Sequence, residues 1–447
     1  MEIKDKKILV FGLGISGKSS VKALSNLGAK VLIFDDREYE ELREDVYSID
    51  EYEFDIIQED VDIPWSELYC VLKSPGIKLE NGLIQEAVSR GIEVITDIEL
   101  AYRLYGGDKF ISITGTNGKT TVTSAIAHIL EQSGEKVRVV GNIGVGLLSE
   151  IYNYGLDYTY VVEVSSFQLE SIRDFRSKIS IITNITPDHL DWHGNFENYI
   201  NAKKNIYKNI KEDDYLILNK DDEILNKINV NANVKYFSIK EKSDCYYDGE
   251  YIINAENKFE RDIINLVGDH NVSNILSAIL ACNSFGLKFN QILEGIKTFK
   301  SIEHRIEFVS EIDGVKYYND SKGTNIDSTK KALSGFKKNV ILIAGGYDKK
   351  IEFDELFEDT SNIKYLISLG ETAQKINEAA KRNKVLNSLI VKDLDEAMEK
   401  AFDLAEKGDV VLLSPACASW GIYKNYIERG NHFKNIVYAY EKKKEEK

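Results

Sequence analysis

The chain has 447 residues, with 57 lysines and arginines against 73 aspartates and glutamates, so its formal net charge is −16. This acidic balance argues against nucleic acid or an anionic membrane surface as a partner. The 4 cysteines lie far apart without a CxxC pair, so neither a disulfide framework nor a zinc ribbon is expected. No apolar run approaches the roughly 18 residues of a membrane span, and we expect a cytoplasmic protein.

Short apolar runs alternate with stretches of helical periodicity along the chain. The runs expected to be strands include Lys7–Phe11, Val31–Phe34, Phe110–Ile113, Tyr158–Val162, Ile179–Ile182, Tyr215–Leu218, Val340–Ala344, Tyr365–Ser368 and Val410–Leu413. Alternating strands and helices predict parallel sheets covered on both faces, an α/β fold. Two seams, at 106–108 and 298–302, predict three α/β domains: 1–107, 108–299 and 300–447.

The first strand leads into a glycine-rich loop, Gly12 to Gly17, with the sequence GLGISG. A helical pattern follows, and Asp35 closes the second strand. Glycines in this setting allow a tight turn and the close approach of a phosphate to a helix N-terminus. The pattern is typical of NAD-binding domains, but the same loop can hold the diphosphate of another nucleotide or form an ordinary turn. The residues alone leave these three interpretations open.

A second glycine-rich loop, with the sequence TGTNGKTT, follows the strand that ends at Ile113. Backbone amides in such a loop can hold phosphates, and here Lys119 would reach the β and γ oxygens and Thr120 would bind Mg²⁺. The strict P-loop pattern requires a glycine where this chain has Ile113, so the loop is a shortened variant. An ordinary glycine-rich turn is the alternative.

Two further polar residues follow strands of the same predicted domain. Glu163 comes directly after the strand that ends at Val162, and His189 comes shortly after the strand that ends at Ile182. A single glutamate or histidine in a loop is usually a surface residue. Ligands of parallel sheets, however, bind at the carboxyl ends of the strands, so this placement favours a role at the phosphate and its metal.

Several segments, in collinear order along nearly the whole chain, resemble the Mur ligase family, the ATP-dependent ligases of peptidoglycan synthesis. They read GTNGKTT, VEVSSFQLE, NITPDHLDWHG followed by Ala202-Lys203, EHRIE, NDSKGTN and LLSPACASWG. SPACAS, GLGISG and the SPG at Ser74 to Gly76 are most similar to the members that add D-glutamate to UDP-N-acetylmuramoyl-L-alanine. The resemblance implies a Rossmann-like N-terminal domain, a central P-loop-type domain and a Rossmann-like C-terminal domain, and it removes the NAD interpretation.

The resemblance also implies a division of the substrates among the three domains. The UDP substrate would meet Gly14, Ile15, Ser16, Asp36, Arg37, Ser74, Gly76 and Asn142. ATP would meet Gly115, Thr116, Asn117, Gly118, Lys119, Thr120, Thr121, Asn271, Arg305 and Asp320. D-glutamate would meet Lys322, Thr324, Lys349, Ser419 and Tyr426. Helix capping is the alternative role for Asn271 and Asp320, a turn is the alternative for Asn142, and Tyr426 replaces an expected phenylalanine.

The catalytic set that the resemblance implies is Lys119, Glu163, His189 and Lys203, with Thr120, Glu163, His189 and Lys203 around Mg²⁺. The family lysine that matches Lys203 is carbamylated by CO₂ and becomes an anionic oxygen ligand near a second Mg²⁺. Carbamylation requires a neutral amine, and therefore a lowered pKa. A plain surface lysine is the alternative, since Lys204 and Lys208 are close by.

Three other functions would predict different features of the sequence. A relative that adds another amino acid, such as a different Mur ligase or a folylpolyglutamate synthase, would differ in the third domain. The diaminopimelate-adding relatives carry a DNPR-like segment that this chain lacks, whereas its SPACAS segment fits D-glutamate. A Rossmann oxidoreductase leaves GTNGKTT unexplained. A non-catalytic nucleotide-binding switch predicts the loss of Glu163, His189 or Lys203, and all three are present. We expect a monomer, because no coiled-coil pattern is visible, and hinge closure between the domains.

Overall fold

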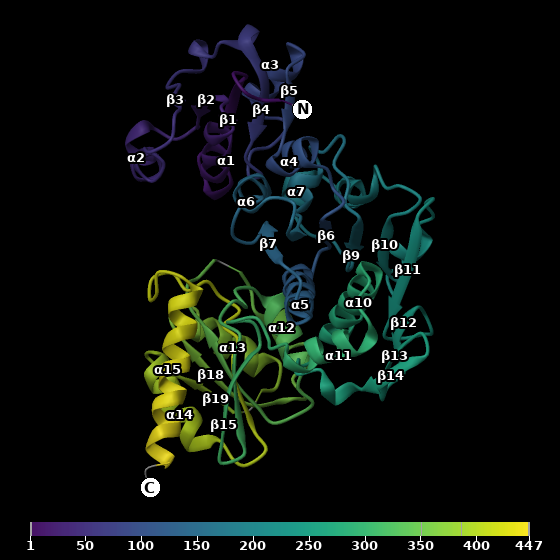
Figure 1. Cartoon of the computed structure of the whole chain (residues 1–447). Coiled ribbons are helices and arrows are strands. Elements are labelled where there is room, and N and C mark those ends of the chain that lie inside the picture. The colour runs from purple at the N-terminus through teal and green to yellow at the C-terminus, as the bar shows by residue number, and fades with distance from the viewer. Residues whose placement is uncertain (1, 350, 386, 446–447) are drawn as a thin grey trace. The chain divides into compact units, whose positions relative to one another are not determined.

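The computed structural model describes residues 2–349, 351–385 and 387–445. Its residues pack into two compact units (Figure 1). The first comprises the residues up to Ile264 together with Val272–Phe299, and the second comprises Asn265–Asn271 and the residues from Lys300 onward. No helix in the described ranges combines the length and the apolar character that crossing a membrane requires.

The first unit begins with a five-stranded parallel sheet in the order β3-β2-β1-β4-β5. Its strands are β1 (Lys7–Phe11), β2 (Lys30–Phe34), β3 (Asp55–Ile56), β4 (Leu68–Lys73) and β5 (Glu93–Ile95). Its helices are α1 (Ile15–Asn26), α2 (Tyr39–Tyr47), α3 (Gly82–Ser89) and α4 (Asp97–Tyr105). Along β1, Ile8 and Val10 belong to one apolar cluster and Leu9 and Phe11 to another, so the strand is buried on both faces and reads as a continuous apolar run.

The second sheet of this unit has nine strands in the order β14-β13-β12-β11-β10-β9-β6-β8-β7. Its strands are β6 (Phe110–Thr114), β7 (Val137–Gly141), β8 (Thr159–Glu163), β9 (Ile179–Ile182), β10 (Tyr215–Asn219), β11 (Asn233–Ser238), β12 (Cys245–Tyr247), β13 (Tyr251–Asn254) and β14 (Asn257–Glu260). Only the pairs β12–β13 and β13–β14 are antiparallel among its described ladders. Because β6 lies between β8 and β9, the loops that follow these three parallel strands share one edge of the sheet.

The helices that follow these strands are α5 (Lys119–Gln132), α6 (Leu147–Tyr154), α7 (Ser166–Leu169), α8 (Leu190–His193), α9 (Phe196–Lys204), α10 (Asp269–Phe285) and α11 (Phe289–Thr298). Short 3₁₀ helices lie at Asp60–Asp62, Trp65–Glu67, Asn205–Tyr207, Leu225–Lys227, Arg261–Ile263 and Asp354–Phe357.

The second unit contains a six-stranded sheet in the order β15-β16-β20-β17-β18-β19, antiparallel only at β15–β16 among its described ladders. Its strands are β15 (Glu307–Ile312), β16 (Val315–Asn319), β17 (Val340–Gly345), β18 (Ile363–Leu369), β19 (Ser388–Ile390) and β20 (Val410–Leu413). Its helices are α12 (Ile326–Ser334), α13 (Ala373–Arg382), α14 (Leu394–Leu404) and α15 (Tyr426–Glu445). Three α/β sheets with covering helices confirm the predicted fold class.

A buried ion pair connects two loops at the amino ends of the second sheet's strands, and it predicts a stability effect. Arg176 donates to both carboxylate oxygens of Asp214 at 2.6 Å, and the Asp214 side chain is fully buried. Burial raises the pKa of Asp214, but the hydrogen bonds from Arg176 and the Lys211 amide, together with the charges of Arg176 and Lys178, outweigh burial and hold that pKa below its usual value. Asp214→Asn leaves the buried Arg176 charge with only the exposed Asp108 as an ion-pair partner, so we expect the unfolding free energy to fall by about 3–5 kcal/mol.

The pH dependence of this contribution has a definite sign. A lowered folded-state pKa stabilises the fold above the unfolded carboxyl pKa of about 4, and this stabilisation is lost as the pH falls through the folded value. Urea unfolding of the wild type and Asp214→Asn should therefore differ most at neutral pH and converge in acid. Asp213→Asn, at an exposed neighbour paired with Lys178, is the control and should have little effect. Equal stabilities at neutral pH would contradict the assignment.

Candidate functional site

The loop between β6 and α5 has the backbone that close phosphate contact requires. Gly115 has φ +148° and Gly118 has φ +84°, both unfavourable for residues with a side chain. A Cβ at Gly115 would lie 1.9 Å from Thr183 Oγ1, and one at Gly118 would lie 2.2 Å from Asn274 Oδ1. Both positions therefore require glycine. The loop leads directly into α5, whose first turn contains Lys119 and the half-buried Thr120.

Asn184 braces this loop from the segment after β9. Its backbone oxygen accepts from the amide of Thr116 at 2.9 Å, and its side chain both accepts from the Asn117 amide at 2.9 Å and donates to the Asn117 oxygen at 3.0 Å. Asn184 opens the NITPDHLDWHG segment, and no role was predicted for it. Its position directly after an apolar strand beside the loop was the available signal.

Two predicted lysines meet at one carbonyl of the loop. Lys119 Nζ and Lys203 Nζ donate to the Gly115 oxygen at 2.9 and 2.8 Å. Lys203, on α9, is only 2% exposed, and its amine lies over the Tyr199 ring. Burial and then the nearby Lys119 charge lower the pKa of Lys203 well below its usual value, against the opposing pull of Asp188 and Glu163. The plain surface lysine considered for position 203 is therefore excluded.

Glu163, the last residue of β8, is held on one side only. Its Oε1 accepts from Asn142 Nδ2 at 2.8 Å, while its buried Oε2 has no hydrogen-bond partner among the described residues. A buried carboxylate oxygen is costly without a proton donor or a cation. Among the described residues, no group of three or more His, Cys, Asp or Glu side chains forms a complete metal site. Glu163 Oε2 thus suits Mg²⁺ that takes its other ligands from phosphates, as Mg²⁺ commonly does.

His189 stands at the same sheet edge, just before α8. Its backbone is left-handed, with φ 51°, and its side chain is 49% exposed. Its Nε2 lies 3.6 Å from Asp188 Oδ2, and its ring contacts Phe167 and Tyr199. The structure therefore places His189 close to the Tyr199–Lys203 pair, with room for a ligand on its open side.

The glycine loop of the first sheet has a matching architecture. Gly12 has φ +90°, its oxygen accepts from Ser74 Oγ at 2.8 Å, and a Cβ at Gly17 would lie 1.9 Å from that oxygen. Asp35 Oδ2 accepts from the Leu13 amide at 2.6 Å and so fixes the turn. Ile15 opens α1 with a side chain that is 73% exposed. The predicted residues Gly14, Ile15, Ser16 and Ser74 therefore lie around one helix N-terminus.

The other residues predicted to meet the UDP substrate in the first domain lie on exposed turns after β2 and β4. The predicted Asp36 and Arg37 are exposed, and Arg37 pairs with Asp35 and Asp45. Gly76 is exposed as well, with open space where a Cβ would stand. All three are open to a ligand at the carboxyl edge of the first sheet, and Asn142 instead belongs to the Glu163 site.

Three further residues predicted to meet ATP fall in the second unit. Asn271 Nδ2 donates to the Val267 oxygen at 2.8 Å near the start of α10, and Arg305 is half-buried before β15. Asp320 follows β16, accepts from Ser414 Oγ at 2.6 Å, and is buried enough to raise its pKa to about 7. None of the described hydrogen bonds gives Asp320 a helix-capping role, since its partners are Ser414 and the Ile306 amide.

The residues predicted to meet D-glutamate come together within the second unit. Lys322 Nζ lies over the Tyr426 ring, and Lys349 Nζ donates to the Thr324 oxygen at 3.4 Å. Ser419 is buried in the loop after β20. Two lysines and a hydroxyl are donors that suit a dicarboxylate.

Arg429 supports this cluster and was not predicted. Its Nη2 donates to the oxygens of Ser321 and Cys417 at 2.9 and 3.1 Å, so it joins the loops that carry Lys322 and Ser419. The side chain is 2% exposed, and burial lowers its pKa to about 10. Because Ser321 lies 108 residues from Arg429 in the sequence, no local pattern indicated this role.

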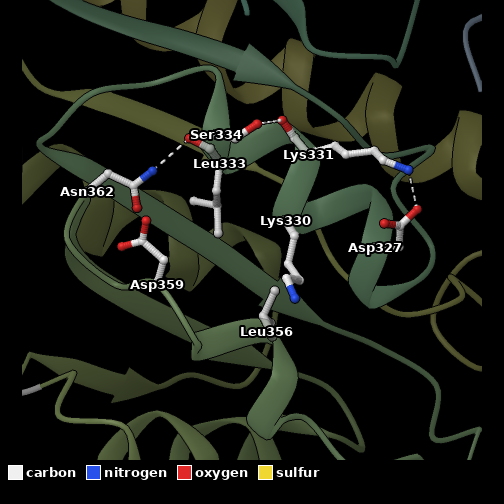
Figure 2. A pocket seen from close by; sticks show the side chains of 8 residues that line it. All are labelled: Asp327, Lys330, Lys331, Leu333, Ser334, Leu356, Asp359 and Asn362. Carbon is white, nitrogen blue, oxygen red and sulfur yellow. Dashed lines mark hydrogen bonds and ion pairs between the residues drawn. The ribbon is translucent and has the colours of Figure 1, made fainter. Parts of the chain in front are cut away.

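A pocket of roughly 350 Å³ lies elsewhere in the second unit (Figure 2). It is lined by Asp327, Lys330, Lys331, Leu333, Ser334, Leu356, Asp359 and Asn362. Lys330 pairs with Glu355 and Glu358, and Asn362 donates to the oxygens of Leu333 and Phe336. None of the residues predicted to bind D-glutamate lines this pocket, so it is separate from that cluster.

These features define a class of protein: a nucleotide-binding α/β enzyme with a diphosphate-type loop on one sheet and a triphosphate-type loop on the next. Family models agree along most of the chain: a Mur ligase MurD-like N-terminal domain matches residues 6–96, the Mur ligase middle domain matches 113–282, and the Mur ligase glutamate ligase domain matches 304–417.

Curated relatives and solved structures point the same way. UDP-N-acetylmuramoylalanine–D-glutamate ligases from Caldanaerobacter subterraneus subsp. tengcongensis and Clostridioides difficile are each 42% identical over 98% of this chain and 99% of theirs. The fold resembles UDP-N-acetylmuramate-alanine ligase from Thermotoga maritima (TM-score 0.62, 18% identity, 97% of this chain and 99% of that one). It also resembles the MurF ligase of that organism in complex with ADP (TM-score 0.59, 18% identity, 85% and 92%). The chain belongs to the Mur ligase family, and it is an ATP-dependent ligase that forms amide bonds.

Proposed function

We propose that the protein joins D-glutamate to UDP-N-acetylmuramoyl-L-alanine, with ATP cleaved to ADP and phosphate, in the cytoplasmic assembly of peptidoglycan precursors. The observation that carries this is the 42% identity, over nearly the full length, to ligases named for that reaction. The cluster of Lys322, Lys349 and Ser419 supports it, since a dicarboxylate acceptor calls for such donors. Residues 1–107, 108–299 and 300–447 would hold the UDP substrate, ATP and the amino acid.

The reaction joins a poor electrophile to an amine. The carboxylate of the UDP substrate would take the γ-phosphoryl group of ATP, and the resulting acyl phosphate would be attacked by the D-glutamate amine, with inorganic phosphate leaving. The partners are anionic, so cations must offset their repulsion while the groups are held in line. Lys119, at the head of α5, would neutralise the phosphates once it leaves the Gly115 and Thr116 oxygens that hold it here.

Magnesium would supply the remaining positive charge. Thr120 and Glu163 would hold one ion, and the unpartnered Glu163 Oε2 is the structural support for it. His189 and Lys203, the latter as a carbamate formed with CO₂, would stand near a second. The buried amine of Lys203, with its lowered pKa, has the chemistry that carbamylation requires.

The test of this function is phosphate release from ATP with UDP-N-acetylmuramoyl-L-alanine and four acceptors compared: D-glutamate, L-glutamate, meso-diaminopimelate and L-lysine. We expect turnover with D-glutamate alone. Turnover with another acceptor would keep the ligase and reject the acceptor assignment in the second unit. A sedimentation measurement under the same conditions tests the expected monomer.

A further inference from the structure

Two buried side chains of the first domain accept hydrogen bonds from the backbone amides at the start of α6, a helix that packs with the second sheet. Gly146 precedes α6 and has no side chain to cap it. Ser19, on α1, accepts from the Gly146 amide at 3.2 Å, and Asp97, the first residue of α4, accepts from the Leu147 amide at 3.0 Å. The free amides at a helix start need acceptors, and here the first domain provides them.

The loop held in this way carries Asn142. It begins where β7 ends at Gly141, whose amide donates to the Val145 oxygen at 3.0 Å. Asn142 donates to Glu163 twice, from its amide to the backbone oxygen at 2.9 Å and from Nδ2 to Oε1 at 2.8 Å. The loop is therefore fixed by Glu163 at one end and by Ser19 and Asp97 at the other.

Two further features extend the connection from Asp97. It lines a cavity of about 10 Å³ together with Ser16, Gly17 and Ser74, residues of the glycine loop and the turn beside it. Its carboxylate also interacts electrostatically with the side chain of Gln168, five residues after Glu163. The oxygen of Gln168 is already used by the Ser165 amide at 3.0 Å. Asp97 thus shares a cavity with the glycine loop and is hydrogen-bonded to the helix start that follows the Asn142 loop.

We propose that Asp97, supported by Ser19, is a positioning residue that couples occupancy of the UDP-substrate loop to the geometry of Asn142 and Glu163. The inference rests on the proposed function for the identity of the UDP substrate. A diphosphate bound at the start of α1 fixes the helix that carries Ser19, and the shared hydrogen bonds then favour one position of the loop after β7. Coupling of this kind is reciprocal, so a magnesium nucleotide at Glu163 raises the affinity for the UDP substrate by the same factor.

The experiment is calorimetric binding of Mg²⁺–ADP to the full chain with and without saturating UDP-N-acetylmuramoyl-L-alanine. For the wild type we expect the two dissociation constants to differ by about fivefold or more. In Asp97→Ala the ratio of these two dissociation constants should fall to near one. The same variant should have a lower kcat and an unchanged KM for D-glutamate. Asp97→Asn, which keeps the volume but turns one acceptor into a donor, tests the same point if the alanine variant does not fold. Two results would overturn the inference. One is a ratio of dissociation constants near one in the wild type, and the other is an unchanged ratio in both Asp97→Ala and Asp97→Asn.

Glu99→Gln is the matched control, on the same helix and equally buried. The Glu99 carboxylate accepts from the amides of Arg173, Asp174 and Phe175, so it also joins the two sheets but touches neither the glycine loop nor the loop after β7. We expect a lower melting temperature with an unchanged coupling ratio. Loss of the ratio in this variant would assign the coupling to general packing and reject the role of Asp97. Failure of the wild type to release phosphate with D-glutamate would reject the proposed function, while the binding ratio would still be measured.

Discussion

Lys203→Ala is expected to lower kcat by about 10²–10³-fold, the loss that follows removal of one preorganised electrostatic group from an active site. The side chain is 2% exposed, donates to the Gly115 oxygen at 2.8 Å, and lies beside Lys119 and Glu163. As a carbamate it would add anionic oxygens at the edge where Mg²⁺ and the phosphates meet. Because the amine must be neutral to react with CO₂, activity should fall as the pH is lowered and recover with added bicarbonate.

Lys204→Ala is the control for this prediction. Lys204 ends the same helix and is half-buried, so its loss tests whether any lysine there affects the rate. We expect unchanged kcat. After equilibration with ¹³C-bicarbonate, the wild type and Lys204→Ala should share a carbamate carbon resonance that Lys203→Ala lacks. A resonance that survives in Lys203→Ala, or full activity of that variant, would remove Lys203 from the catalytic set.

Three strands whose residues are mostly apolar and buried have the bounds that the sequence predicts. Lys7–Phe11, Ile179–Ile182 and Val410–Leu413 have the predicted bounds, because parallel strands covered on both faces are continuous apolar runs. The run from Tyr158 to Val162 is displaced by one residue, since the strand is Thr159–Glu163. Glu163 pairs with Gly141 in the ladder, and hydropathy alone would not place a buried carboxylate in a strand.

The residues of the candidate site likewise fall into two groups, those that a local motif predicts and those that it does not. Local chemistry identified the glycine loops and Lys119, because a glycine followed by a lysine at a helix start is a pattern within one segment. Asp97, Asn184 and Arg429 act through partners 50 or more residues away, such as Leu147, Thr116 and Ser321. Their roles depend on which strands become neighbours, which no single segment specifies.

Glu163→Gln should lower kcat by about 10²–10³-fold while leaving the ligand-free protein at least as stable as the wild type. The amide keeps the volume and the acceptor that Asn142 Nδ2 binds, but it removes a buried charge whose Oε2 has no partner among the described residues. Removing such a group relieves a cost that only a cation offsets. The combination of lost activity and retained stability is what distinguishes a metal-binding carboxylate from one that holds the fold together.

Thermal unfolding with and without Mg²⁺–ADP measures both effects together. A ligand that binds only the folded state raises the melting temperature, so the wild type should gain stability from Mg²⁺–ADP and Glu163→Gln should gain less. Glu150→Gln is the control, because Glu150 is buried and pairs with Arg138 at 2.6 Å. Its substitution should lower the melting temperature of the ligand-free protein and leave the gain from Mg²⁺–ADP unchanged. An undiminished Mg²⁺-dependent gain in Glu163→Gln would show that the metal is held by other groups, and the unpartnered oxygen would then need a different explanation.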